Sequence, residues 1–136
     1  MRYAILCAAL VALAACGNDA HEEEHGEEVH AHEAKHGGEV VVVVEHELFV
    51  EVKHDEEAGT MTVWAYAGEA MAEAKLDEPP VLNFVGESGP AQLTAEQAGG
   101  AWRFQDDALK GEPEGARLRL RVGGKSYTPA LAHQHD

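Results

Sequence analysis

From Gly38 onward, the apolar residues of this chain recur with a period of two, in short runs separated by turn residues. This pattern limits the fold more than any other feature, because side chains of a β-strand alternate between the two faces of a sheet. Residues 117–122 show it most clearly, since leucine and valine alternate there with arginine. Gly123 and Gly124 follow, and such a pair is typical of a hairpin turn. The chain is therefore expected to be all-β.

The short runs predict about seven strands of a single antiparallel β-sandwich, of immunoglobulin-like size, within residues 38–131. A small barrel is the competing architecture. Residues 106–111 predict one helical turn ended by a glycine, and residues 69–75 predict an edge strand or loop. The strand candidates are residues 40–45, 47–53, 60–66, 80–85, 91–94, 101–104, 117–122 and 125–128.

Alternation also predicts which side chains are buried and which face water. Phe49 and Glu51 alternate with the apolar residues of the second strand candidate. Arg117, Arg119 and Arg121 alternate with apolar residues too, and we expect them to form a solvated face beside acidic residues of neighbouring strands. The expected core contains Val50, Val52, Val63, Leu82, Phe84, Leu118, Leu120 and Val122.

The start of the chain has the pattern of an export signal. Arg2 precedes an apolar run at residues 4–15, which is the length of a signal segment and too short to span a bilayer. The run ends Leu-Ala-Ala before Cys16, which resembles the lipobox of bacterial lipoproteins. The resemblance implies cleavage after residues 1–15 and acylation of Cys16, which gives stable membrane anchoring. An ordinary signal peptide that contains a cysteine is the alternative.

The residue after that cysteine bears on localisation. It is Gly17 rather than aspartate. By resemblance to lipoprotein sorting in diderm bacteria, this implies a cell-envelope protein at the outer membrane that faces the periplasm.

Composition excludes several classes of function. The formal net charge of −15 repels phosphate backbones, so a nucleic-acid partner is not expected. Cys7 would leave with the signal and Cys16 would be acylated, so metal ligands would have to be histidine and carboxylate. Ser88 and Ser126 are the only serines, and neither lies in a nucleophile motif. We therefore expect no enzymatic activity.

Histidine is the distinctive residue type, with nine in the chain. Residues 16–37 are rich in His and Glu and poor in large apolar residues, so they predict a disordered tether. Neutral imidazole is a common ligand of zinc, nickel and copper(II), and carboxylates complete such sites. A simple acidic spacer is the alternative for this segment. The metal-ligand candidates are His21, His25, His30, His32 and His36 in the tether, His54 at a strand end, and His133 and His135 in the C-terminal tail, residues 132–136.

Short motifs add a resemblance. They are His-Gly-Gly at residues 36–38 before a Val-rich strand, Val-Lys-His-Asp at 52–55, Gly-Thr at 59–60, and Gly-Lys-Ser-Tyr-Thr at 124–128. Together they resemble a group of small His-rich bacterial lipoproteins of uncharacterised function. The opening motif is also similar to the front domain of heavy-metal efflux adaptor proteins. This implies a metal-related role in the envelope, although the chain lacks the coiled-coil hairpin and lipoyl-like segments of an adaptor.

Two hypotheses follow. In the first, the protein is an envelope lipoprotein that binds or buffers a divalent transition metal, zinc foremost, and presents it to an envelope metal transporter or efflux complex. In the second, it is a tethered, non-enzymatic protein–protein interaction module, and the histidine segment is a spacer.

Overall fold

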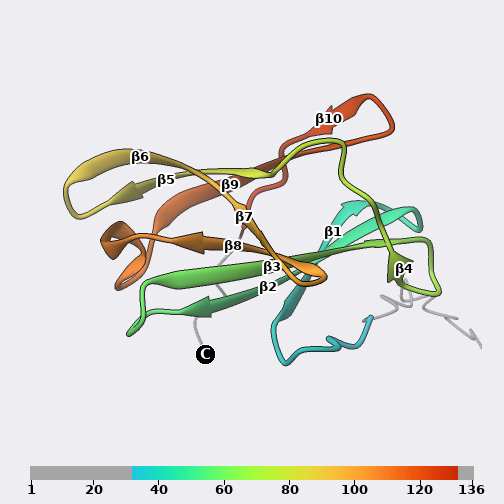
Figure 1. The fold of residues 1–136 in the computed structure, drawn as a ribbon, viewed down its shortest axis with the longest axis horizontal. Coiled ribbons are helices and arrows are strands. Elements are labelled where there is room, and N and C mark those ends of the chain that lie inside the picture. The colour runs from blue at the N-terminus through green and yellow to red at the C-terminus, as the bar shows by residue number, and fades with distance from the viewer. Residues whose placement is uncertain (1–31, 132–136) are drawn as a thin grey trace, which may run out of the picture.

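The structure, a computed structural model, describes residues 32–131, which form two antiparallel β-sheets packed face to face (Figure 1). One sheet has the order β1-β2-β3-β8-β7, with β4 added beside β3, and the other has the order β10-β9-β5-β6. The expected all-β sandwich is confirmed. The strands are β1 (Glu39–Val44), β2 (Leu48–Asp55), β3 (Thr60–Ala67), β4 (Ala72–Glu73), β5 (Val81–Gly86), β6 (Gly89–Thr94), β7 (Glu96–Ala98), β8 (Ala101–Gln105), β9 (Glu114–Val122) and β10 (Lys125–Tyr127).

The described part of the chain has ten strands where eight segments were strand candidates, because two short edge strands, β4 and β7, add to them. β4 falls within the segment predicted as edge strand or loop. β7 was not expected, because its sequence Glu-Gln-Ala has no β-branched or aromatic residue. It forms where the chain passes from one sheet to the other: β6 pairs with β5, Ala95 is buried, and β7 then pairs with β8.

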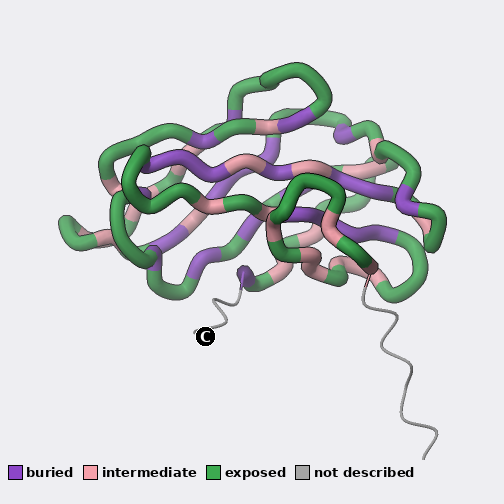
Figure 2. Tube along the Cα trace, turned by 90° about the horizontal axis from the view of Figure 1, so that it is seen from below, coloured by how far each residue is buried: buried purple, intermediate pink, exposed green. Residues whose placement is uncertain are grey.

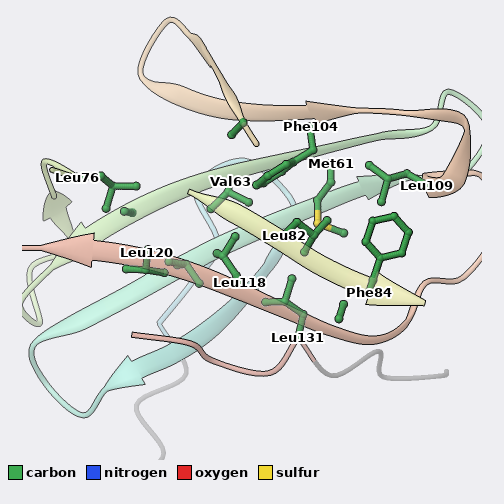
Figure 3. Packing of buried hydrophobic residues seen from close by; sticks show 14 of the residues in the cluster. Met61, Val63, Leu76, Leu82, Phe84, Phe104, Leu109, Leu118, Leu120 and Leu131 are labelled. Atoms are coloured by element: carbon green, nitrogen blue, oxygen red, sulfur yellow. The ribbon is translucent and has the colours of Figure 1, made fainter. Parts of the chain in front are cut away.

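The main core lies between the two sheets, where both inner faces carry apolar side chains (Figure 3). Along β9 the exposure alternates, with Leu118 and Leu120 buried and the arginines exposed, as the sequence pattern predicts. Val52 and Val122 are half-buried at the margin of this core. Most buried residues lie in the strands of the sandwich, and most of its turn residues are exposed (Figure 2).

The predicted helical turn is a short 3-10 turn, η1 (Asp107–Leu109). Asp106 caps it, because its carboxylate accepts a hydrogen bond from the N–H of Ala108 at 2.9 Å. The turn inserts Leu109 fully into the core. Within the described residues, no helix is long and apolar enough to cross a membrane.

The expectation that the arginines of β9 lie beside acidic residues is wrong. In the sheet register, Arg117 pairs with Asn83, Arg119 with Val81, and Arg121 with Ser126. Strand order, which the sequence pattern does not contain, decided these neighbours.

The core predicts a first measurable effect. Leu120 is 2% exposed and packs between the sheets, so Leu120→Ala should lower the free energy of unfolding by about 2–5 kcal/mol. Urea denaturation of residues 17–136 at pH 7 measures this. As a control, Arg119→Ala on the opposite face of the same strand should change it by less than about 0.5 kcal/mol. Equal effects of the two changes would contradict the assignment of the faces.

Candidate functional site

The outer face of the six-stranded sheet has a buried charge. Glu51 lies on β2 between Val50 and Val52, on the side away from the main core, yet it is fully buried. Phe49 and Tyr66 on the same face are also buried and form a second apolar cluster with Met71. Because these side chains face away from the other sheet, something else must cover them.

The cover is the segment of residues 32–38, which we call the strap. The carboxylate of Glu51 accepts hydrogen bonds from the backbone N–H groups of Lys35 at 3.1 Å, His36 at 2.7 Å and Gly38 at 3.0 Å. The hydroxyl of Tyr66 donates a fourth at 3.2 Å. A carboxylate offers about four acceptor sites, so these donors fill it.

Two glycines allow the strap to turn so closely around one carboxylate. Gly37 has a φ of +76°, a conformation that side chains with a Cβ rarely adopt. At Gly38, a Cβ would lie 2.6 Å from the carbonyl oxygen of Val52. The His-Gly-Gly motif is thus explained by local backbone geometry, where the sequence had suggested only a resemblance.

The side chains of the strap pack on the aromatic residues of the sheet. The ring of His36 stacks on Trp64, with centroids 4.1 Å apart and planes inclined by 9°. The ring of His32 lies 4.1 Å from that of Phe49, tilted by 54°. Lys35 places its Nζ 4.9 Å from the ring centre of Tyr66 and donates a hydrogen bond to the Met71 carbonyl at 2.7 Å. These contacts extend the packed part of the chain upstream of Gly38, into residues expected to belong to the tether.

The hydrogen bonds determine the ionisation of this cluster. Burial by itself raises the pKa of Glu51. Hydrogen bonds from the N–H groups of Gly38, His36 and Lys35 and from the Tyr66 hydroxyl together lower it by more than burial raises it, so the net pKa lies below 4.5. Burial, together with the charge of Glu51, raises the pKa of Tyr66 to about 12. Glu51 is therefore an anion and Tyr66 a neutral donor at physiological pH.

A hollow of about 360 Å³ lies beside the strap. His36 and Glu73 both line it, together with Trp64, Tyr66 and Met71. Imidazole and carboxylate are the ligand types that zinc accepts in addition to thiolate. Glu73 was not a sequence candidate, since carboxylates are frequent everywhere in so acidic a chain.

The remaining candidate ligands are distributed elsewhere. His54 on β2 lies at the other end of the sandwich, where its Nε2 is 2.7 Å from the Leu109 carbonyl oxygen. His46, in the turn after β1, has its Nδ1 2.6 Å from Glu69 and its Nε2 3.5 Å from Glu45. Within residues 32–131, no group of three or more His, Cys, Asp or Glu side chains is arranged to hold a metal ion.

The other sequence candidates lie outside the described residues. They are the signal segment 1–15, Cys16, His21, His25 and His30 upstream of the strap, and His133 and His135 in the C-terminal tail. The structure therefore brings His36 to a hollow with Glu73, places His32 on the same strap, and separates His54 from both.

Sequence reasoning missed the role of Glu51, which looked like an ordinary outward residue of a half-buried strand. A signal was present, because Phe49, Trp64 and Tyr66 occupy outward positions of neighbouring strands. Large aromatic residues on both faces of a sheet indicate that both faces are covered. Comparisons of the chain with protein-family models, curated proteins and solved structures found no match.

Replacing the buried carboxylate should release the strap. Glu51→Gln removes the charged acceptor of three N–H groups, so we expect the free energy of unfolding to fall by at least about 2 kcal/mol at pH 7. Hydrogen exchange of the amides of Lys35, His36 and Gly38 should accelerate, while that of β5 and β9 stays slow. Unchanged exchange of the three amides would show that Glu51 does not hold the strap.

The same variant should differ from the parent in its pH dependence. Because the pKa of folded Glu51 lies below 4.5, the unfolded chain takes up the proton at a higher pH than the folded chain does. The stability that this charge contributes is therefore complete above about pH 4.5 and is lost as the pH falls through the folded pKa. The stability difference between parent and Glu51→Gln should be constant from pH 6 to 8 and shrink towards pH 3.

Proposed function

We propose that this protein is a membrane-anchored envelope lipoprotein that binds a divalent transition metal, zinc foremost, through its His/Glu-rich N-terminal segment. The observation that carries the proposal is the hollow lined by both His36 and Glu73, where the last histidine of that segment is fixed on the sheet. The anchor is the acyl group of Cys16.

The available donor atoms favour a metal ion that is intermediate between hard and soft. Beyond Cys16 the chain has no thiol, and imidazole with carboxylate suits zinc, nickel and copper(II) better than copper(I). The stack of His36 on Trp64 restricts rotation of the imidazole ring, so less side-chain entropy is lost when that ring binds a metal ion.

Two ligands do not complete a zinc site, which takes four in structural centres and three plus water in catalytic ones. His32 packs on Phe49 outside the hollow, whereas His21, His25 and His30 precede the strap in the sequence. In this proposal the three upstream histidines supply the missing nitrogens, so that metal binding ties the upstream segment to the sheet beside Glu73. Loaded protein would then be available to an envelope metal transporter or efflux complex.

The metal hypothesis predicts specific losses in a calorimetric titration of residues 17–136 with zinc at pH 7.5. His36→Ala and Glu73→Gln should each weaken binding about tenfold or more, as removal of a ligand does. His46→Ala and Glu69→Gln are matched controls, since these exposed residues lie outside the hollow, and they should leave the affinity unchanged. Equal effects of the test and control variants would exclude the proposed site.

Two further conditions separate coordination from simple charge attraction. Imidazole must release its proton to bind a metal, so affinity should fall sharply from about pH 7.5 to about 5.5. Attraction to carboxylates alone would persist at the lower pH and weaken with added salt.

Deleting residues 20–31, which keeps the strap, should remove most of the bound zinc. If the shortened chain bound as much, the segment would be a spacer.

The anchor has its own test. Cys16→Ala should move the protein from the membrane fraction to the soluble fraction or leave the precursor uncut, because no acyl group can be attached. Fractionation and intact mass of the full chain measure both outcomes. An unchanged mass and distribution would contradict the lipobox interpretation.

A further inference from the structure

The outer face of the four-stranded sheet carries a row of three arginines among neutral side chains. The row is Arg117, Arg119 and Arg121, which are exposed along β9. We call this surface the arginine face. In addition to the arginines, it consists of Val81, Asn83 and Val85 of β5, Pro90, Gln92 and Thr94 of β6, and Ser126 of β10.

The register leaves the arginines without carboxylates beside them. The residues directly opposite on β5 and β10 are Asn83, Val81 and Ser126. Along β9 itself, the first carboxylate is Glu114, which lies beyond an irregularity in the ladder and opposite Val85. The face is thus bounded by an acidic residue at one end and is neutral beside the arginines.

Carboxylates in the neighbouring loops do not neutralise the charge of the three arginines either. In the part of the chain that the structure describes, no ion pair involves these three arginines, although the chain has 25 Asp and Glu. Asp77 meets β9 through a backbone hydrogen bond to Arg121, but its carboxylate accepts the N–H groups of Gly123 and Gly124. The guanidinium groups are therefore available to an external anion.

A shallow hollow of about 470 Å³ adjoins the row next to Arg117. Asn83, Val85, Gln92 and Gly115 are among its lining residues. Val85 is 46% exposed and is one of two large apolar residues so exposed in the described chain. The arginine face therefore offers apolar contact beside its charges.

We propose that the arginine face binds an extended acidic segment of a partner protein, with carboxylates at alternate positions. Alternate residues of a strand lie roughly 6.6 Å apart, so an extended segment that runs along β9 matches the spacing of the arginines. The planar guanidinium group of arginine pairs with carboxylate through two parallel hydrogen bonds. Three carboxylates fit, because a fourth past Arg117 would meet Glu114.

Charge and chain direction disfavour a membrane as the partner. The net charge of −15 of the whole chain repels an extended anionic membrane surface, whereas a short acidic segment interacts mainly with the nearby arginines. The strap also lies on the opposite side of the sandwich: His32 contacts Phe49, and in Figure 1 the start of the described chain lies below β2 and β3 while β9 lies above. The arginine face thus points away from the surface by which the chain enters the domain.

The test uses residues 17–136, which include every strand of the described structure, and two labelled six-residue peptides of three Glu and three Thr. In one peptide the Glu residues alternate, and in the other they are contiguous. By fluorescence anisotropy at low ionic strength, the alternating peptide should bind at least about fivefold more tightly, and added salt should weaken its binding. Equal affinity for the two peptides, or no binding of either, would overturn the proposal.

Two triple variants that remove the same amount of positive charge test whether the peptide binds at the arginine face. The triple variant Arg117→Gln, Arg119→Gln, Arg121→Gln should weaken binding at least tenfold. The triple control Lys53→Gln, Lys75→Gln, Arg103→Gln alters exposed residues outside the arginine face and should keep more than half of the affinity. Replacing the three arginines by lysine preserves the charge and should give an intermediate loss. Equal losses in the first two variants would reveal net charge, not the face, as the cause.

Two alternative occupants are separate outcomes. Arginine-dependent sedimentation with vesicles of phosphatidylglycerol and phosphatidylethanolamine, without discrimination between the peptides, would overturn the proposal in favour of lipid phosphate. Arginine-dependent self-association in sedimentation equilibrium would overturn it in favour of a second copy. Because the zinc titration uses different residues, either hypothesis can fail while the other stands.

Discussion

The carboxylate of Glu51 is a charge taken out of water, and its four donors determine how the N-terminal part of the domain lies. A buried anion is costly unless hydrogen bonds replace its hydration. Three of the replacing donors are backbone N–H groups of the strap, so these charge-assisted hydrogen bonds tie the strap to the sheet. This one interaction places the rings of His32 and His36 on the sheet and fixes the direction from which the upstream segment approaches.

The strap also explains why one sheet has two apolar faces. The inner side chains of β2 and β3 belong to the main core, and the outer ones form the smaller cluster around Phe49, Tyr66 and Met71. Among residues 32–131, no comparable segment covers the arginines of β9, which are exposed. The sandwich is therefore asymmetric, and we place its two proposed activities on opposite sides: metal binding beside the strap and anion binding on the arginine face.

Much of the fold could be predicted from sequence because alternation is a local property. Residues 117–122 have the same two faces in the structure as in the pattern, and the Gly-Gly turn joins β9 to β10. β7 was not predictable in this way, since its residues lack strand propensity and only pairing with β8 makes it a strand. The site was less predictable still: His36 was a candidate, but Glu51 and Glu73 were indistinguishable from the other carboxylates.

The sequence by itself determined the class of fold, the side of β9 that faces the main core, and the ligand chemistry open to a chain that has no cysteine beyond Cys16. Those properties follow from residue type and period, which do not depend on where other segments lie. Only the tertiary structure decided that Glu51 receives the strap, that Glu73 shares a hollow with His36, and that the arginines of β9 stand beside neutral residues. The reason is that burial, hydrogen bonding and charge pairing are set by neighbours distant in the chain, and strand order and register bring those neighbours together.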